Sequence, residues 1–82
     1  MKITVRVFGR YKDIAGKDML QFDINEGDTI RSVVDLFVKR YPETERDKKF
    51  MMVSKNKTFA SLNTTIAEGD EVTLSPPVVS GG

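Results

Sequence analysis

The stretch that decides the fold is TIRSVVDLFVKRYP, residues 29–42. Its apolar side chains recur at intervals of three and four residues, which places them on one face of a helix with 3.6 residues per turn. The members of this stripe are Ile30, Val33, Val34, Phe37, Val38 and Tyr41. Asp28 or Thr29 supplies an oxygen for the free amides at the helix start, and Pro42 disfavours helical backbone at Tyr41. The sequence therefore predicts one amphipathic helix whose apolar face needs a second layer.

Two runs of alternating apolar and polar residues precede this helix, at residues 3–8 and 19–24. Alternation with a period of two is typical of a strand with one buried face. The predicted buried side chains are Ile3, Val5, Val7, Leu20, Phe22 and Ile24. Residues 9–17 between the two runs are polar, so we predict an antiparallel pair joined by a wide hairpin loop.

The second half of the chain contains shorter elements. Residues 43–49 are charged and are expected to form a solvated connection, and residues 50–53 an apolar strand. Residues 54–57 are typical of a turn, and residues 58–62 fit either a brief strand or a turn of helix. The run EVTL at residues 71–74 is a clearer strand, which follows a turn and ends before two prolines.

These elements predict an α+β fold with two layers, because one helix stripe requires one sheet face to cover it. If the first and last strands are parallel neighbours, the arrangement is a ubiquitin-like β-grasp, a mixed sheet wrapped on one main helix. We expect residues 1–75 to form this domain and residues 76–82 to form an extended C-terminal tail.

The tail carries the reactive group that we predict. Pro76 and Pro77 lack amide donors, so the sheet cannot continue past Ser75. Gly81 and Gly82 have no Cβ and fit a channel that is too narrow for side chains. We expect the tail to present the terminal carboxylate of Gly82 to another enzyme.

Composition excludes several other classes of function. Thirteen basic and twelve acidic residues give a net charge of +1, which provides no field for recruiting nucleic acid or an anionic membrane. The longest apolar run has four residues and no signal-peptide pattern opens the chain, so we expect a cytoplasmic protein without a membrane span. Cysteine and histidine are absent, which removes thiolate nucleophiles and most zinc sites, and we expect no bound metal. No phosphate-cradling glycine loop is present, so no cofactor is expected on this chain and ATP should bind a partner.

Four short motifs carry a family resemblance: FGRYKDIAG at residues 8–16, EGDEV at 68–72, PPV at 76–78 and SGG at 80–82. With them the whole chain resembles the MoaD/ThiS group of ubiquitin-like sulfur carriers, and within it most of all the small subunit of molybdopterin synthase. That family usually has one small residue between the PPV and GG motifs, so Val79 is an additional residue here.

The resemblance implies a co-substrate that is not itself a catalyst. In such proteins an ATP-dependent adenylyltransferase similar to ubiquitin-activating enzymes adenylates the terminal glycine, and a sulfurtransferase supplies sulfur to form a thiocarboxylate. The large catalytic subunit of molybdopterin synthase then accepts that sulfur. By resemblance, Gly82 and Gly81 form the reacting end, and the residues that bind partners are Phe8, Phe59, Pro76, Pro77 and Val78.

Several of these residues have a second interpretation. Phe8 lies on the strand face opposite the predicted core, which agrees with docking but also with an ordinary surface aromatic. Phe59 lies in the ambiguous segment, where the pattern slightly favours the core. Asp70 and Glu71 could be a catalytic carboxylate pair. They could also simply form the turn before the last strand, and this second interpretation needs fewer assumptions.

Other functions fit the same tail. A ubiquitin-like modifier would join Gly82 to lysine side chains of other proteins, because an amine attacks the same activated carboxylate. A sulfur carrier for thiazole or transfer-RNA thiolation would use identical chemistry with a different acceptor. A plain interaction module with a glycine tail is the remaining alternative.

Overall fold

The structure is a computed structural model, and it describes residues 1–77. Five strands and three helices follow one another in the order β1 (Lys2–Val7), α1 (Arg10–Ala15), β2 (Met19–Asp23), α2 (Ile30–Arg40), the 3₁₀ helix η1 (Pro42–Asp47), β3 (Met52–Lys55), β4 (Thr58–Phe59) and β5 (Glu71–Ser75).

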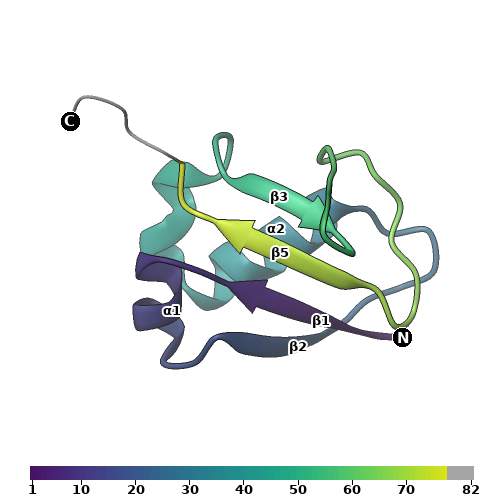
Figure 1. Ribbon diagram of the computed structural model, residues 1–82, viewed down its shortest axis with the longest axis horizontal. Coiled ribbons are helices and arrows are strands. Elements are labelled where there is room, and N and C mark those ends of the chain that lie inside the picture. Colours follow the sequence, from purple (N-terminus) through teal and green to yellow (C-terminus); the bar gives the residue numbers. More distant parts are fainter. Residues whose placement is uncertain (78–82) are drawn as a thin grey trace.

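The strands form one mixed sheet in the order β2-β1-β5-β3-β4. β1 and β5 are parallel neighbours at its centre, and the other pairs are antiparallel. In register, Val5 pairs with both Leu20 and Val72. α2 runs across one face of this sheet (Figure 1). The predicted β-grasp fold, with its parallel pairing of the first and last strands, is therefore confirmed.

α2 begins and ends where the sequence predicts. Thr29 is the residue before its first turn, and the Thr29 amide donates a hydrogen bond of 3.3 Å to Ser32 Oγ. At the other end, the amide of Tyr41 donates to the Phe37 carbonyl at 2.8 Å, and Pro42 follows. Both ends thus satisfy backbone groups that a helix terminus leaves free.

The core lies between α2 and the sheet. Five members of the α2 stripe form one buried cluster with the inward side chains of β1, β2, β3 and β5 and with Tyr11, Met51 and Ile66. The buried apolar residues are Ile3, Val5, Val7, Tyr11, Leu20, Phe22, Ile24, Ile30, Val33, Val34, Phe37, Val38, Met51, Val53, Ile66, Val72 and Leu74.

The prediction of a wide polar loop at residues 9–17 is wrong, because this segment contains α1. Tyr11 of α1 is fully buried, with its ring centroid 5.3 Å from that of Phe37. Its hydroxyl donates a hydrogen bond of 2.8 Å to Asp47 Oδ2. A tyrosine in a polar run can be buried when its hydroxyl finds such a partner.

The prediction of a solvated connection at residues 43–49 is also partly wrong. Residues 42–47 form η1, in which Thr44 and Asp47 are buried. Asp47 accepts hydrogen bonds from Arg10 and Tyr11, and Thr44 Oγ1 donates to the Tyr41 carbonyl. These polar side chains are buried because each has a protein partner in place of water.

The third strand lies two residues later than predicted. β3 begins at Met52, and Phe50 in the preceding turn is 67% exposed. The turn between β3 and β4 is made by Asn56 and Lys57, both with positive φ. Phe59 belongs to the edge strand β4 and is 86% exposed, so the interpretation of Phe59 as a core residue is wrong.

Within residues 1–77, no helix has both the length and the apolar character that crossing a membrane requires.

Candidate functional site

The sheet face that α2 leaves uncovered is the candidate site, and we call it the outer face. Figure 1 looks onto this face, with α2 behind the strands. Strand register places one outer-face residue of each strand in a single row across the sheet. That row runs through Met19, Arg6, Thr73, Ser54 and Phe59.

Four large apolar side chains project from this face. Phe59 is 86% exposed, Phe8 47%, Met19 45% and Met52 41%. Scattered exposed apolar residues are ordinary, but four that share one sheet face are typical of a surface that another protein covers. We call these four residues the outer-face patch.

A shallow groove of about 90 Å³ lies within the outer face over β3, with β4 on one side and β5 on the other. Phe59 and Met52 line one side of it, and Thr73 and Ser75 line the other. Ser75 pairs with Met52 and is the last residue of β5. The groove therefore leads from the most exposed aromatic side chain to the point where the chain leaves the sheet.

The base of the tail is held against the end of β1. Phe8 donates its amide to the Leu74 carbonyl at 3.3 Å, and Pro76 lies beside Gly9. Pro76 and Pro77, two of the predicted partner-binding residues, are both half-buried. The predicted site residues Val78, Gly81 and Gly82 lie outside the described residues, as does Val79.

The carboxylates near β5 hold the structure together, which favours the turn interpretation of Asp70 and Glu71. Asn56 Nδ2 donates to Asp70 Oδ1 at 3.1 Å, and the Ala67 amide donates to Oδ2 at 2.8 Å. These two hydrogen bonds hold the pKa of Asp70 below its usual value. A lowered pKa is the opposite of what a general acid or base needs near neutral pH. Glu71 forms an ion pair with Arg6 at 3.5 Å.

The structure brings Phe8 and Phe59 to the same face, which the sequence could not establish. Two members of the outer-face patch, Met19 and Met52, were not predicted as site residues. The alternation of β2 places Met19 opposite Leu20, and Met52 likewise alternates with the buried Val53. That signal was available, but it identifies a shared surface only when the strand order is known.

Among residues 1–77, no group of three histidine, cysteine, aspartate or glutamate side chains is placed to hold a metal ion.

The family profile and a curated relative both point to one protein family. The profile of the ThiS family matches residues 5–82. The molybdopterin synthase sulfur carrier subunit of Arabidopsis thaliana is 24% identical over 82 residues, which cover 100% of this chain and 84% of that protein.

Two solved structures share the fold over nearly the whole chain. SAMP1 from Haloferax volcanii, a small archaeal modifier protein, is 28% identical with a TM-score of 0.83, and the match covers 100% of both chains. A complex of subunits 1 and 2 of molybdopterin-converting factor from Helicobacter pylori contains a chain that is 22% identical with a TM-score of 0.65. That match covers 99% of this chain and 100% of the other.

Proposed function

This chain belongs to the ThiS family and is a ubiquitin-like sulfur carrier of the MoaD/ThiS type, and from that premise we propose its pathway. Gly82 is adenylated and thiocarboxylated, and it then donates sulfur for molybdopterin biosynthesis, with this chain as the small subunit of molybdopterin synthase. The chain is then a co-substrate that brings sulfur to a catalytic partner.

The chemistry requires little of this chain beyond its terminal carboxylate. A carboxylate is a poor electrophile, so a partner adenylyltransferase first joins it to AMP from ATP, with release of pyrophosphate. Sulfur at the oxidation level of sulfide, delivered by a sulfurtransferase, attacks the acyl carbon, the bond to AMP breaks with release of AMP, and a thiocarboxylate results. Because the chain has no cysteine, Gly82 is the position that carries acyl-bound sulfur. No cofactor is needed on the chain itself, and ATP is used by the activating partner.

The outer-face patch is the observation that carries the proposal for partner binding. Phe59 lines the groove that ends at Ser75, and Phe8 is hydrogen-bonded to Leu74 near the base of the tail; both side chains retain large exposed areas. We propose that the large catalytic subunit of molybdopterin synthase covers this face and receives the tail, with Pro76, Pro77 and Val78 along its entrance. The Helicobacter pylori relative, whose structure is a complex of two subunits, supports a partner of this kind.

The test is a reconstitution followed by intact-protein mass spectrometry. The full chain is incubated with an activating enzyme, ATP and a sulfur donor, and we expect a mass increase equal to one oxygen-to-sulfur exchange at Gly82. A variant that lacks Gly82 is the control and should gain nothing. Sulfur located at any other residue, or no exchange with any activating enzyme tested, would overturn the proposal.

A second candidate is supported by the 28% identity to SAMP1, which is a modifier protein. The same acyl-adenylate can react with a lysine amine, which gives an isopeptide bond and releases AMP. Immunoblots of cells that express the tagged chain would then show high-mass conjugates, which disappear when Gly82 is deleted. Absence of conjugates in cells that still form the thiocarboxylate would leave sulfur transfer as the function.

A further inference from the structure

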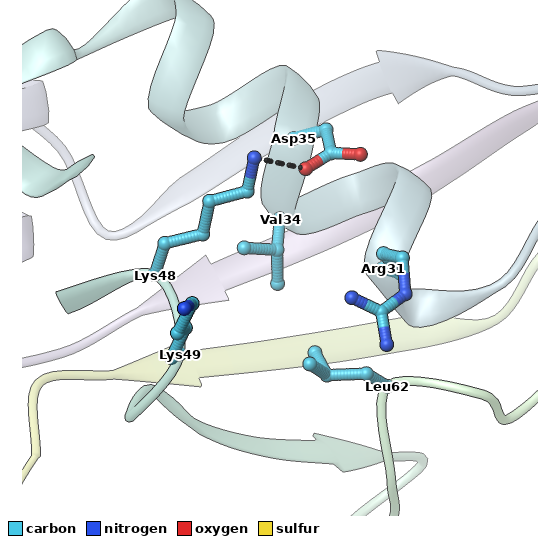
Figure 2. Close-up of a pocket in the computed structure, with 6 residues that line it drawn as sticks. All are labelled: Arg31, Val34, Asp35, Lys48, Lys49 and Leu62. Carbon is cyan, nitrogen blue, oxygen red and sulfur yellow. Dashed lines mark ion pairs between the residues drawn. The ribbon is translucent and has the colours of Figure 1, made fainter. Parts of the chain in front are cut away.

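A second cavity, of about 250 Å³, lies on the α2 side of the sheet, away from the outer face. Figure 2 shows the side chains of three separate segments arranged around it. They come from α2, from the turn after η1 and from the connection that follows β4. The lining residues are Arg31, Val34, Asp35, Lys48, Lys49 and Leu62.

Backbone hydrogen bonds hold two walls of this cavity in place. The amide of Arg31 donates to the Leu62 carbonyl at 2.9 Å, which fixes the connection after β4 against the start of α2. The amide of Lys48 donates to the Glu45 carbonyl at 3.0 Å, and that of Phe50 to the Asp47 carbonyl at 2.8 Å. The cavity is therefore formed before any ligand arrives.

The cavity combines an apolar floor with a positively charged rim. Leu62 supplies aliphatic surface, and Val34, only 1% exposed, closes the floor beneath it. Three cations stand against the one carboxylate of Asp35. Lys48 Nζ lies 2.8 Å from Asp35 Oδ1, as the dashed line in Figure 2 marks. Neither Arg31 nor Lys49 belongs to any ion pair among residues 1–77. Two cationic groups thus remain for an external anion.

We propose that this cavity is a docking site for an acidic segment of a partner protein. An aliphatic side chain of that segment lies against Leu62, above the floor that Val34 closes, and neighbouring carboxylates lie against Arg31 and Lys49. The volume supports this occupant, because pockets that enclose a whole small molecule usually measure roughly 300–1,000 Å³. Charge complementarity at such a rim selects partners and directs their approach.

This inference does not depend on the chemistry at Gly82. The cavity and the outer face lie on different sides of the sheet, so a partner can hold the α2 side while the outer face binds another protein. A carrier that passes between enzymes would gain from such a second contact.

The test is an NMR titration of the ¹⁵N-labelled full chain with a blocked acidic peptide of sequence EELEE. We expect saturable amide shifts centred on residues 31–35, 48–49 and 62. The dissociation constant should be about 1 mM, which corresponds to weak binding. The shifts should diminish as salt is raised toward about 1 M, where the Debye length is only about 3 Å. Under the same conditions, the peptide KKLKK should not bind at this cavity.

Two variants with matched charge reversals distinguish specific binding at this cavity from nonspecific electrostatic attraction to the protein. The double variant Arg31→Glu/Lys49→Glu should bind EELEE about tenfold more weakly. The double variant Lys12→Glu/Lys17→Glu has the same net charge but changes exposed residues outside the cavity, and it should bind as the unmodified chain does. Equal weakening in both variants, shifts spread over the whole surface, or equal binding of the peptide EEGEE would each overturn the proposal.

Discussion

Gly9 lies directly against Pro76, the first residue after β5, and leaves little space between them for a side chain. A Cβ placed on Gly9 would lie 3.3 Å from Pro76 Cγ and 3.4 Å from Cδ. Gly9 also has φ of 60° and ψ of −140°, a conformation that side chains rarely adopt. The turn after β1 is therefore packed against the first residue of the tail.

Replacing Gly9 by alanine should displace Pro76 at the base of the tail. The added methyl group would push Pro76 away, so we expect slower formation of the thiocarboxylate in the reconstituted reaction. The positive φ should also lower the free energy of unfolding by about 1–2 kcal/mol. Gly16→Ala is the matched control, because Gly16 has φ of 78° and no neighbouring atom within 4 Å of an added Cβ. If Gly16→Ala slows the reaction as much as Gly9→Ala does, the effect comes from stability and not from the tail.

The buried hydroxyl of Tyr11 should contribute measurably to stability. Tyr11→Phe removes the hydrogen bond to Asp47 and leaves a buried carboxylate oxygen with Arg10 as its remaining partner. We expect the free energy of unfolding to fall by about 1–3 kcal/mol, as measured by urea denaturation. Tyr41→Phe serves as the control, since no hydrogen bond of the Tyr41 hydroxyl occurs within residues 1–77, and it should change stability by less than about 0.5 kcal/mol. Equal losses in the two variants would contradict the role assigned to Asp47.

The fold could be predicted wherever one periodicity persists along a segment. α2 shows a clear 3.6-residue stripe, and β1, β2 and β5 show clean alternation. α1 and η1 could not be predicted in the same way, because their burial depends on a contact between Tyr11 and Asp47 across 36 residues of sequence. Polar residues that hydrogen-bond to each other across such a long stretch of sequence cannot be told from solvent-exposed residues by a local sequence pattern.

The candidate site was predictable in part, for a related reason. Alternation alone places Phe8 opposite the core face of β1. The exposure of Phe59 depends on β4 being a two-residue edge strand, which is too short to show any period. The common row from Met19 to Phe59 requires the strand order, which the four strand pairings establish together.

Stability should decrease in acid because of Asp70. Hydrogen bonds from Asn56 and from the Ala67 amide favour the charged carboxylate and hold its pKa below that of the unfolded chain. A depressed pKa in the folded state stabilises the protein fully above the unfolded value of about 3.9, and this contribution is lost as pH falls through the folded value. Urea denaturation at a series of pH values below about 4 should show this loss, and Asp70→Asn should show a smaller one. If the free energy of unfolding of Asp70→Asn falls with decreasing pH as steeply as that of the unmodified chain, other carboxylates cause the loss.

Asn56 should stabilise the turn that joins these segments in two separable ways. Its side chain bonds both Asp70 and the Glu71 amide, and its φ of 51° is one that asparagine tolerates. Asn56→Gly keeps the backbone conformation but loses both hydrogen bonds, so we expect a loss of about 1–2 kcal/mol in the free energy of unfolding. Asn56→Ala also incurs the cost of positive φ and should be less stable than Asn56→Gly. Thermal and urea denaturation of both variants measure the two contributions, and the reverse ranking would contradict this assignment.

Phe59 should matter for binding and not for folding. Because its side chain is 86% exposed, Phe59→Ala should change the free energy of unfolding by less than about 0.5 kcal/mol. If the outer face docks the large catalytic subunit, the same variant should weaken that complex by about tenfold or more, as loss of a large aromatic contact commonly does. Phe50→Ala is the matched control, because Phe50 is 67% exposed but lies in the turn before β3. Isothermal titration calorimetry of both variants against the large subunit decides the matter, since equal affinities would mean that the partner binds elsewhere.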